Sequence, residues 1–138
     1  MQQNNWPKRD EDRAFLTWLE AQGAKLQPVT LPNARFSAML TMLEAEAATA
    51  FDEFVRNGLA AQLPGQGEGD WPNQFRAART IPAVEYLQAA RARSQLLVEM
   101  AAALGEIDVF VAPTHGGPTL SCTNLTGHPT YVLPVGQS

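Results

Sequence analysis

The sequence contains few of the residues that mark several common classes of protein. A single cysteine excludes a disulfide within the chain and is typical of a reducing compartment. The only lysines are Lys8 and Lys25, and a net charge of −4 argues against the basic surface of a nucleic-acid-binding protein. No apolar run is long enough to cross a bilayer, and no signal peptide opens the chain. We therefore expect a cytoplasmic protein with neither a nucleic acid nor a membrane as its partner.

The chain does contain enough apolar residues for a folded core. Of its 138 residues, 45% are hydrophobic and only 17% are charged. This length predicts one domain, comprising residues 1–138, or a part of a larger domain. The low charge suggests that part of the surface is normally covered by another segment or chain.

Three segments have the apolar periodicity of helices, and each is followed by a glycine. They are expected at residues 10–22, 34–57 and 82–104, with a shorter helix at 73–80. Residues 59–72 contain several glycines and two prolines and are predicted to form a surface loop. The buried stripe of the last helix is expected at Val84, Leu87, Ala90, Ser94, Leu97, Val98, Ala101 and Leu104.

Two short apolar runs near the C-terminus are typical of buried strands. They are residues 107–112 and 131–135, separated by a polar loop rich in Gly, Pro, Thr and Asn. A third strand is expected at 25–31, at a sheet edge because Pro28 interrupts it. Helices alternating with strands predict an α/β fold in which helices cover a partial sheet. The loop between the last two strands is where any chemistry of this chain is expected.

The residues do not form a complete catalytic set. Cys122 with His115 and His128 suggests a thiol nucleophile, but the interpretation that we favour makes all three ordinary loop and turn residues. The same three residues lack the fourth ligand and the spacing of a zinc site. Neither lysine lies near a promising serine, and no phosphate-binding loop is present. We expect no catalytic residue, no metal and no cofactor.

Four arginines lie on or before the long predicted helix: Arg76, Arg79, Arg91 and Arg93. Such side chains usually meet solvent or a protein carboxylate. The functional alternative is that one of them binds a substrate carboxylate or another anion.

Several segments, in order, resemble the C-terminal part of the amidase signature family. They are WLEAQGAKLQPVTLP, FRAARTIPAVEYLQAARARSQL, IDVFVAPT and TNLTGHPTYVLPVG, which together cover about residues 15–136. The family hydrolyses or transfers amide groups with a Ser–cis-Ser–Lys triad on a large mixed sheet flanked by helices, and it includes simple amidases and the A subunit of the glutamyl-tRNA amidotransferase. The triad lies N-terminal to the matched segments, so the chain resembles a C-terminal piece, truncated at both ends.

The resemblance implies five substrate-side residues. Arg93 matches an arginine that faces a substrate carboxylate in amidotransferase-type members, and Tyr86 is the matching tyrosine on the same helical face. Thr123, Asn124 and Gly127 match a loop near the catalytic pocket, although Asn124 and Gly127 also suit turn geometry alone. Only residues 115–122 separate the two C-terminal motifs, where amidotransferase-type members carry a longer acidic segment. This favours a simpler amidase parent.

Two functions follow as expectations. The first is a C-terminal, substrate-side fragment of an amidase-signature enzyme, which is inactive alone and pairs with the missing N-terminal half around a small amide substrate. The second is a non-catalytic α/β binding or assembly module that forms a homo-oligomer through exposed sheet edges.

Overall fold

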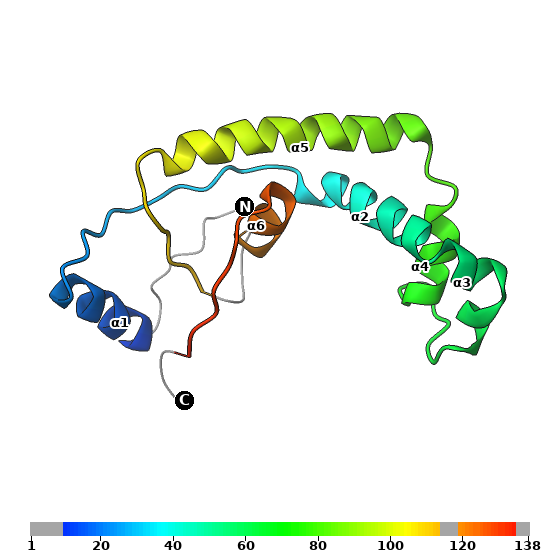
Figure 1. Cartoon of the computed structure of the whole chain (residues 1–138), viewed down its shortest axis with the longest axis horizontal. Coiled ribbons are helices and arrows are strands. Elements are labelled where there is room, and N and C mark those ends of the chain that lie inside the picture. The colour runs from blue at the N-terminus through cyan, green and yellow to red at the C-terminus, as the bar shows by residue number, and fades with distance from the viewer. Residues whose placement is uncertain (1–9, 114–118, 135–138) are drawn as a thin grey trace. The chain divides into compact units, whose positions relative to one another are not determined.

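The computed structural model describes residues 10–113 and 119–134, and all of the regular structure in these ranges is helical (Figure 1). In chain order the elements are α1 (Asp10–Ala21), α2 (Phe36–Ala50), α3 (Asp52–Arg56), the 3-10 helix η1 (Leu59–Gln62), α4 (Trp71–Ala78), α5 (Ala83–Leu104) and α6 (Thr119–Thr126). The helices predicted at 10–22 and 82–104 are confirmed, as α1 and α5. The helix predicted at 73–80 is present as α4, which begins two residues earlier.

The predicted α/β fold is wrong, because the described residues contain no strand. Residues 25–31 and 107–112 form neither helix nor strand, and neither do residues 131–134 of the last predicted strand, whose Val135 lies outside the described residues. There is accordingly no partial mixed sheet for the helices to cover in the described part of the chain. The sheet edges that the assembly hypothesis required are missing there as well.

The physical reason is that an apolar run favours an extended backbone but cannot form a strand alone. A strand forms when its N–H and C=O groups pair with a neighbour, and single strands are not stable in water. Val109 and Tyr131 instead expose 76% and 86% of their surface. The apolar runs led to the strand prediction, whereas the pairing that a strand requires was assumed.

Helix α6 occupies part of the predicted inter-strand loop. The amino-acid composition of this segment does not indicate a helix, because Thr, Ser and Asn are poor helix formers. Within the helix the hydroxyl groups of Thr123 and Thr126 donate to the carbonyl oxygens of Thr119 and Cys122, at 3.0 and 2.7 Å. Gly127 follows with φ of 75°, the left-handed geometry of a helix C-cap. This glycine was the sequence signal for the helix end.

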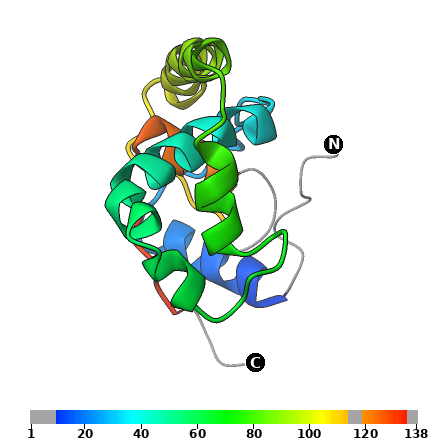
Figure 2. The ribbon, with the colours of Figure 1, turned by 90° about the vertical axis from the view of Figure 1, so that its right-hand side faces the viewer.

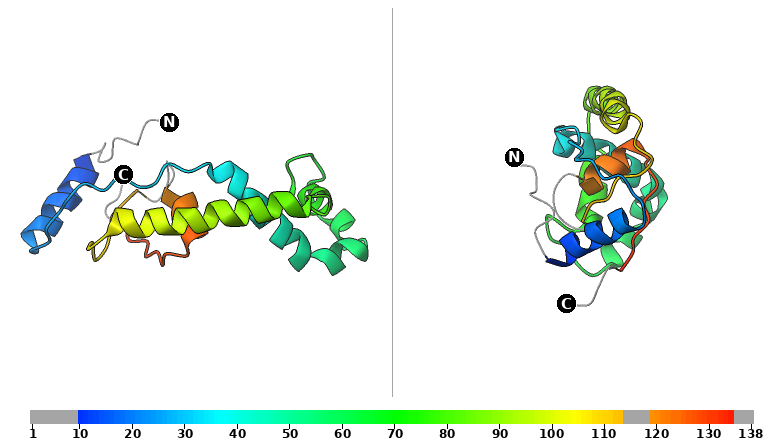
Figure 3. Two further views of the ribbon diagram at one scale, coloured as in Figure 1. Left: turned by 90° about the horizontal axis from the view of Figure 1, so that it is seen from above. Right: turned by 90° about the vertical axis from the view of Figure 1, so that its left-hand side faces the viewer.

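The chain divides into two compact units. Residues Ala34–Leu96 form the central unit, and Met1–Asn33 with Leu97–Ser138 form the terminal unit. Helix α5 contributes to both units, because the boundary falls between Leu96 and Leu97. It is one uninterrupted helix of 22 residues (Figure 3).

In the central unit, α4 packs against α2 and α3 (Figure 2), and an aromatic cluster lies at this contact. Phe75 of α4 is only 7% exposed. Its ring stacks on Phe51 with a centroid distance of 4.8 Å and contacts Trp71 in a tilted arrangement with a centroid distance of 5.5 Å. Phe51 also separates α2 from α3, so the single helix predicted over 34–57 is in fact two helices.

Side chains hold the loop between η1 and α4 in a defined conformation. The Gln66 amide donates to the carbonyl oxygens of Ala60 and Leu63, both at 3.0 Å, and the Asn73 amide donates to the carbonyl oxygen of Gln66 at 2.6 Å. The Asp70 carboxylate accepts the Gly67 N–H at 2.7 Å. All of these polar groups are therefore hydrogen-bonded within one short segment. The segment is an ordered turn and not a flexible linker.

Replacing Gly65 by alanine should destabilise the central unit by about 1–3 kcal/mol, the range for a strained backbone residue. Gly65 has φ of +77°, and an added Cβ would lie 3.0 Å from the Asp70 carboxylate. Gly69→Ala is the matched control, because nothing lies within 4 Å of its added Cβ. Urea unfolding followed by circular dichroism measures both variants. Equal stabilities of the two variants would contradict the predicted strain.

The buried stripe of α5 differs from the predicted one. The fully buried side chains are Ala89, Leu96 and Met100, whereas Val98 is 65% exposed. Val84 and Leu87 are exposed as well. The helical periodicity was predicted correctly. Because the helix is rich in alanine, several of its faces could form the buried stripe. In the structure, the face that packs inward is the one that carries Tyr86, Arg93 and Met100.

Candidate functional site

Tyr86 and Arg93 lie half-buried on the same side of α5, as their spacing of seven residues predicts. The Tyr86 hydroxyl donates to Glu46 Oε1 of α2 at 3.1 Å. Glu46 therefore joins this pair, although the sequence reasoning missed it. Its only signal was an acidic position on the predicted second helix, which could not indicate a partner forty residues away.

The electrostatics of Tyr86 reflect these neighbours. Its pKa is raised, first because the hydroxyl donates a hydrogen bond to the Glu46 carboxylate, and then because the charge of that carboxylate opposes ionisation. Desolvation adds a smaller increase, and the positive charge of Arg93 opposes it. The three side chains thus influence one another, and the tyrosine stays a neutral hydrogen-bond donor near pH 7.

Thr123, Asn124 and Gly127 belong to α6 and its C-terminal turn, in the terminal unit. Thr123 is buried, and its hydroxyl is used within the helix. Asn124 is exposed. Gly127 caps the helix, and the His128 N–H donates to the Thr123 carbonyl oxygen at 3.1 Å. In this geometry Thr123 and Gly127 serve the helix, and Asn124 alone presents a polar group to solvent.

The five residues predicted from the resemblance therefore form two local groups. Tyr86 and Arg93 lie together in the central unit, and the other three lie on one short helix of the terminal unit. Because the two groups belong to different units, each is a separate set of side chains. Tyr86, Glu46 and Arg93 bring together a hydroxyl, a carboxylate and a guanidinium group, but they include no nucleophile with an adjacent base.

Cys122 has the environment of a core residue. Its side chain is fully buried, and its Sγ lies 3.5 Å from Sδ of Met100 on α5, which is fully buried too. Burial raises the pKa of the thiol, which disfavours the reactive thiolate. The Nδ1 atom of His128 lies 2.7 Å from the Thr126 hydroxyl. His115, the third residue of that hypothesis, lies outside the described residues.

We expect Cys122 to resist alkylation in the folded protein. Iodoacetamide labelling at neutral pH, followed by mass spectrometry, should be much slower in buffer than in denaturant, because both burial and the raised pKa oppose reaction. Labelling at the same rate in both conditions would show that the thiol is accessible.

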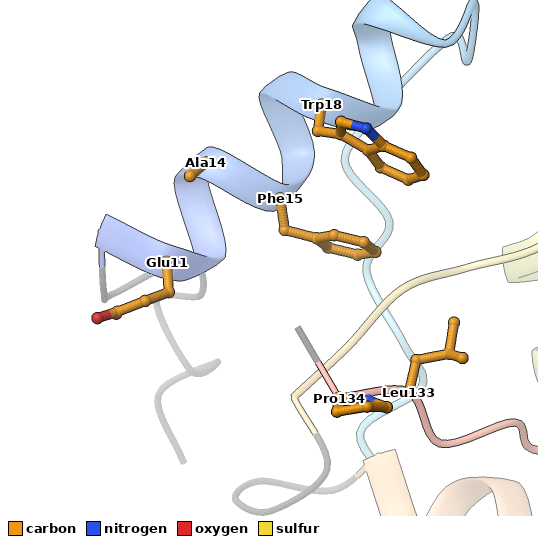
Figure 4. A pocket seen from close by; sticks show the side chains of 6 residues that line it. All are labelled: Glu11, Ala14, Phe15, Trp18, Leu133 and Pro134. Atoms are coloured by element: carbon orange, nitrogen blue, oxygen red, sulfur yellow. The ribbon is translucent and has the colours of Figure 1, made fainter. Parts of the chain in front are cut away.

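The terminal unit also carries an open apolar hollow of about 550 Å³, lined by Glu11, Ala14, Phe15, Trp18, Leu133 and Pro134 (Figure 4). The rings of Phe15 and Trp18 are stacked with centroids 6.0 Å apart. The hollow includes none of the predicted site residues. Its single carboxylate, on Glu11, provides no partner for acid–base or nucleophilic chemistry.

Comparisons with known proteins assign no family to the chain. No family model matches it, and no curated protein or solved structure is significantly similar to it. The part of the chain that the structure describes contains no cluster of three or more metal-ligating His, Cys, Asp or Glu side chains. In the same residues, no helix has the length and apolar character of a membrane span.

Proposed function

We propose that this chain is the substrate-side, C-terminal portion of an amide hydrolase of the amidase signature type, inactive by itself. The observation that carries the proposal is the order of the motifs IDVFVAPT and TNLTGHP after a helix with a tyrosine and an arginine seven residues apart. A triad serine from the N-terminal half of the parent attacks the amide carbonyl. This chain contributes no nucleophile.

Arg93 orients a substrate anion in this proposal, and Tyr86 lies beside it. The support is local: both side chains share one side of an uninterrupted helix, and the Glu46 carboxylate accepts a hydrogen bond from Tyr86. A guanidinium group suits a carboxylate because its N–H groups match the two oxygens. The small amide substrate then carries a carboxylate in addition to its amide.

The test compares the chain alone with the product of the complete parent gene. The chain alone should not hydrolyse simple amides, and the parent should. In the parent, Arg93→Gln should raise KM for a carboxylate-bearing amide and leave KM for a neutral amide unchanged, with the neighbouring Arg91→Gln as control. Turnover by the chain alone that a substitution in this chain abolishes would contradict the proposal, and so would an upstream reading frame without a Gly/Ser-rich segment and a distant lysine.

A second candidate is a non-catalytic binding or assembly module. It is favoured by the many large apolar side chains that the described residues expose, among them Trp18, Trp71, Leu87 and Tyr131. Because no strand is described, association would use helical surfaces and not sheet edges.

A further inference from the structure

The aromatic cluster of the central unit reaches the surface on both sides of Phe75. Phe51 is 48% exposed and Trp71 is 51% exposed, while Phe75 between them is buried. Aromatic side chains of this kind contribute much of the binding energy at protein interfaces. We call Phe51, Trp71 and Phe75 the aromatic patch.

The charges on either end of α4 have opposite signs. Glu68 and Asp70 precede the helix, and Arg76 and Arg79 lie in and directly after its last turn. Eight residues make α4 roughly 12 Å long, so the two ends are well separated. The helix dipole has the reverse polarity, positive at the N-terminus and negative at the C-terminus.

We infer that the aromatic patch is a self-association surface, on which α4 packs antiparallel to α4 of a second copy of this chain. A two-fold axis brings the acidic end of each helix to the basic end of the other, so both ends of the contact pair opposite charges. The exposed faces of Phe51 and Trp71 are then covered at the centre.

A second copy fits this surface better than a basic or an acidic partner. A partner of one sign would be attracted at one end of α4 and repelled at the other. At the basic end, the single carboxylate of Asp52 pairs with both Arg56 and Arg79, so a net positive charge remains there. This inference does not depend on the proposed amide chemistry, since it uses none of the residues of that site.

Sedimentation equilibrium of the full chain over a range of concentrations tests the inference, with a dimer as the expected result. Glu68→Arg and Arg79→Glu should each raise the dimer dissociation constant about tenfold or more, because like charges then face each other at both ends of the contact. A mixture of the two variants should form a heterodimer as tightly as the original chain, since every facing pair is again of opposite sign.

Glu20→Arg on α1 is the matched control, because it changes the net charge as Glu68→Arg does but lies far from α4 in the sequence. It should leave the dimer unchanged. Trp71→Ser should also weaken the dimer, with circular dichroism to confirm that the helices persist. If Arg79→Glu does not fold, Glu68→Arg still tests the contact. A monomer at all concentrations, a dimer indifferent to Glu68→Arg, or failure of the mixed variants to associate would each overturn the inference.

Discussion

Replacing Phe75 by alanine should lower the free energy of unfolding by about 3–5 kcal/mol, the usual effect of removing a buried phenylalanine. Phe75 is buried, stacks on Phe51 and contacts the tilted ring of Trp71. Its loss removes the ring contacts that join α4 to the end of α2 and leaves a cavity between them. Urea unfolding followed by circular dichroism measures the change.

The matched control for this variant is Tyr131→Ala. Tyr131 is an aromatic residue of similar size that is almost fully exposed. Its removal should change the stability by less than about 0.5 kcal/mol, as is usual for surface positions. If the two variants lost the same stability, the assignment of Phe75 to the core of the central unit would be wrong.

Met100→Ala should destabilise the terminal unit by about 2–5 kcal/mol, the range for truncation of a buried methionine. Met100 is completely buried, and its sulfur lies against that of Cys122, so it connects α5 to α6. The loss should also increase the rate at which Cys122 reacts with iodoacetamide, because α6 would then detach more often. Unfolding and labelling rates are two independent measurements of this contact.

Val98→Ala on the same helix provides the comparison. The sequence pattern places Val98 in the buried stripe, whereas the structure leaves it 65% exposed. The structure therefore predicts a change within about 0.5 kcal/mol, because alanine also has the higher helix propensity. A loss at Val98 larger than the loss at Met100 would favour the stripe that the sequence predicts.

The strands were the largest error of the sequence-based interpretation, and residues 107–112 show why. Their apolar, β-branched run favours an extended backbone, but no strand forms there. Whether such a segment becomes a strand depends on a partner elsewhere in space, which a local pattern does not contain. The resemblance to the amidase signature family supplied that partner as an expectation, and the described residues do not provide it.

The candidate site could be predicted only in part. The spacing of Tyr86 and Arg93 on a helix was enough to place them on one side, because the helical period is a local property. Glu46 could not be found, since its contact with Tyr86 depends on how α5 packs on α2. Cys122 was predicted to be an ordinary loop residue, whereas it lies on the buried face of α6.

The sequence by itself determined the positions of α1 and α5 and the ends marked by Gly23, Gly58 and Gly105. Helical periodicity, acidic first turns and glycine caps act within a few residues and need no distant partner. Only the tertiary structure decided which face of α5 is buried, that the apolar runs stay unpaired in the described residues, and that Phe51, Phe75 and Trp71 form one cluster. These properties depend on contacts between segments far apart in the chain, where side-chain shape and the available partners select one arrangement among several that the local pattern allows.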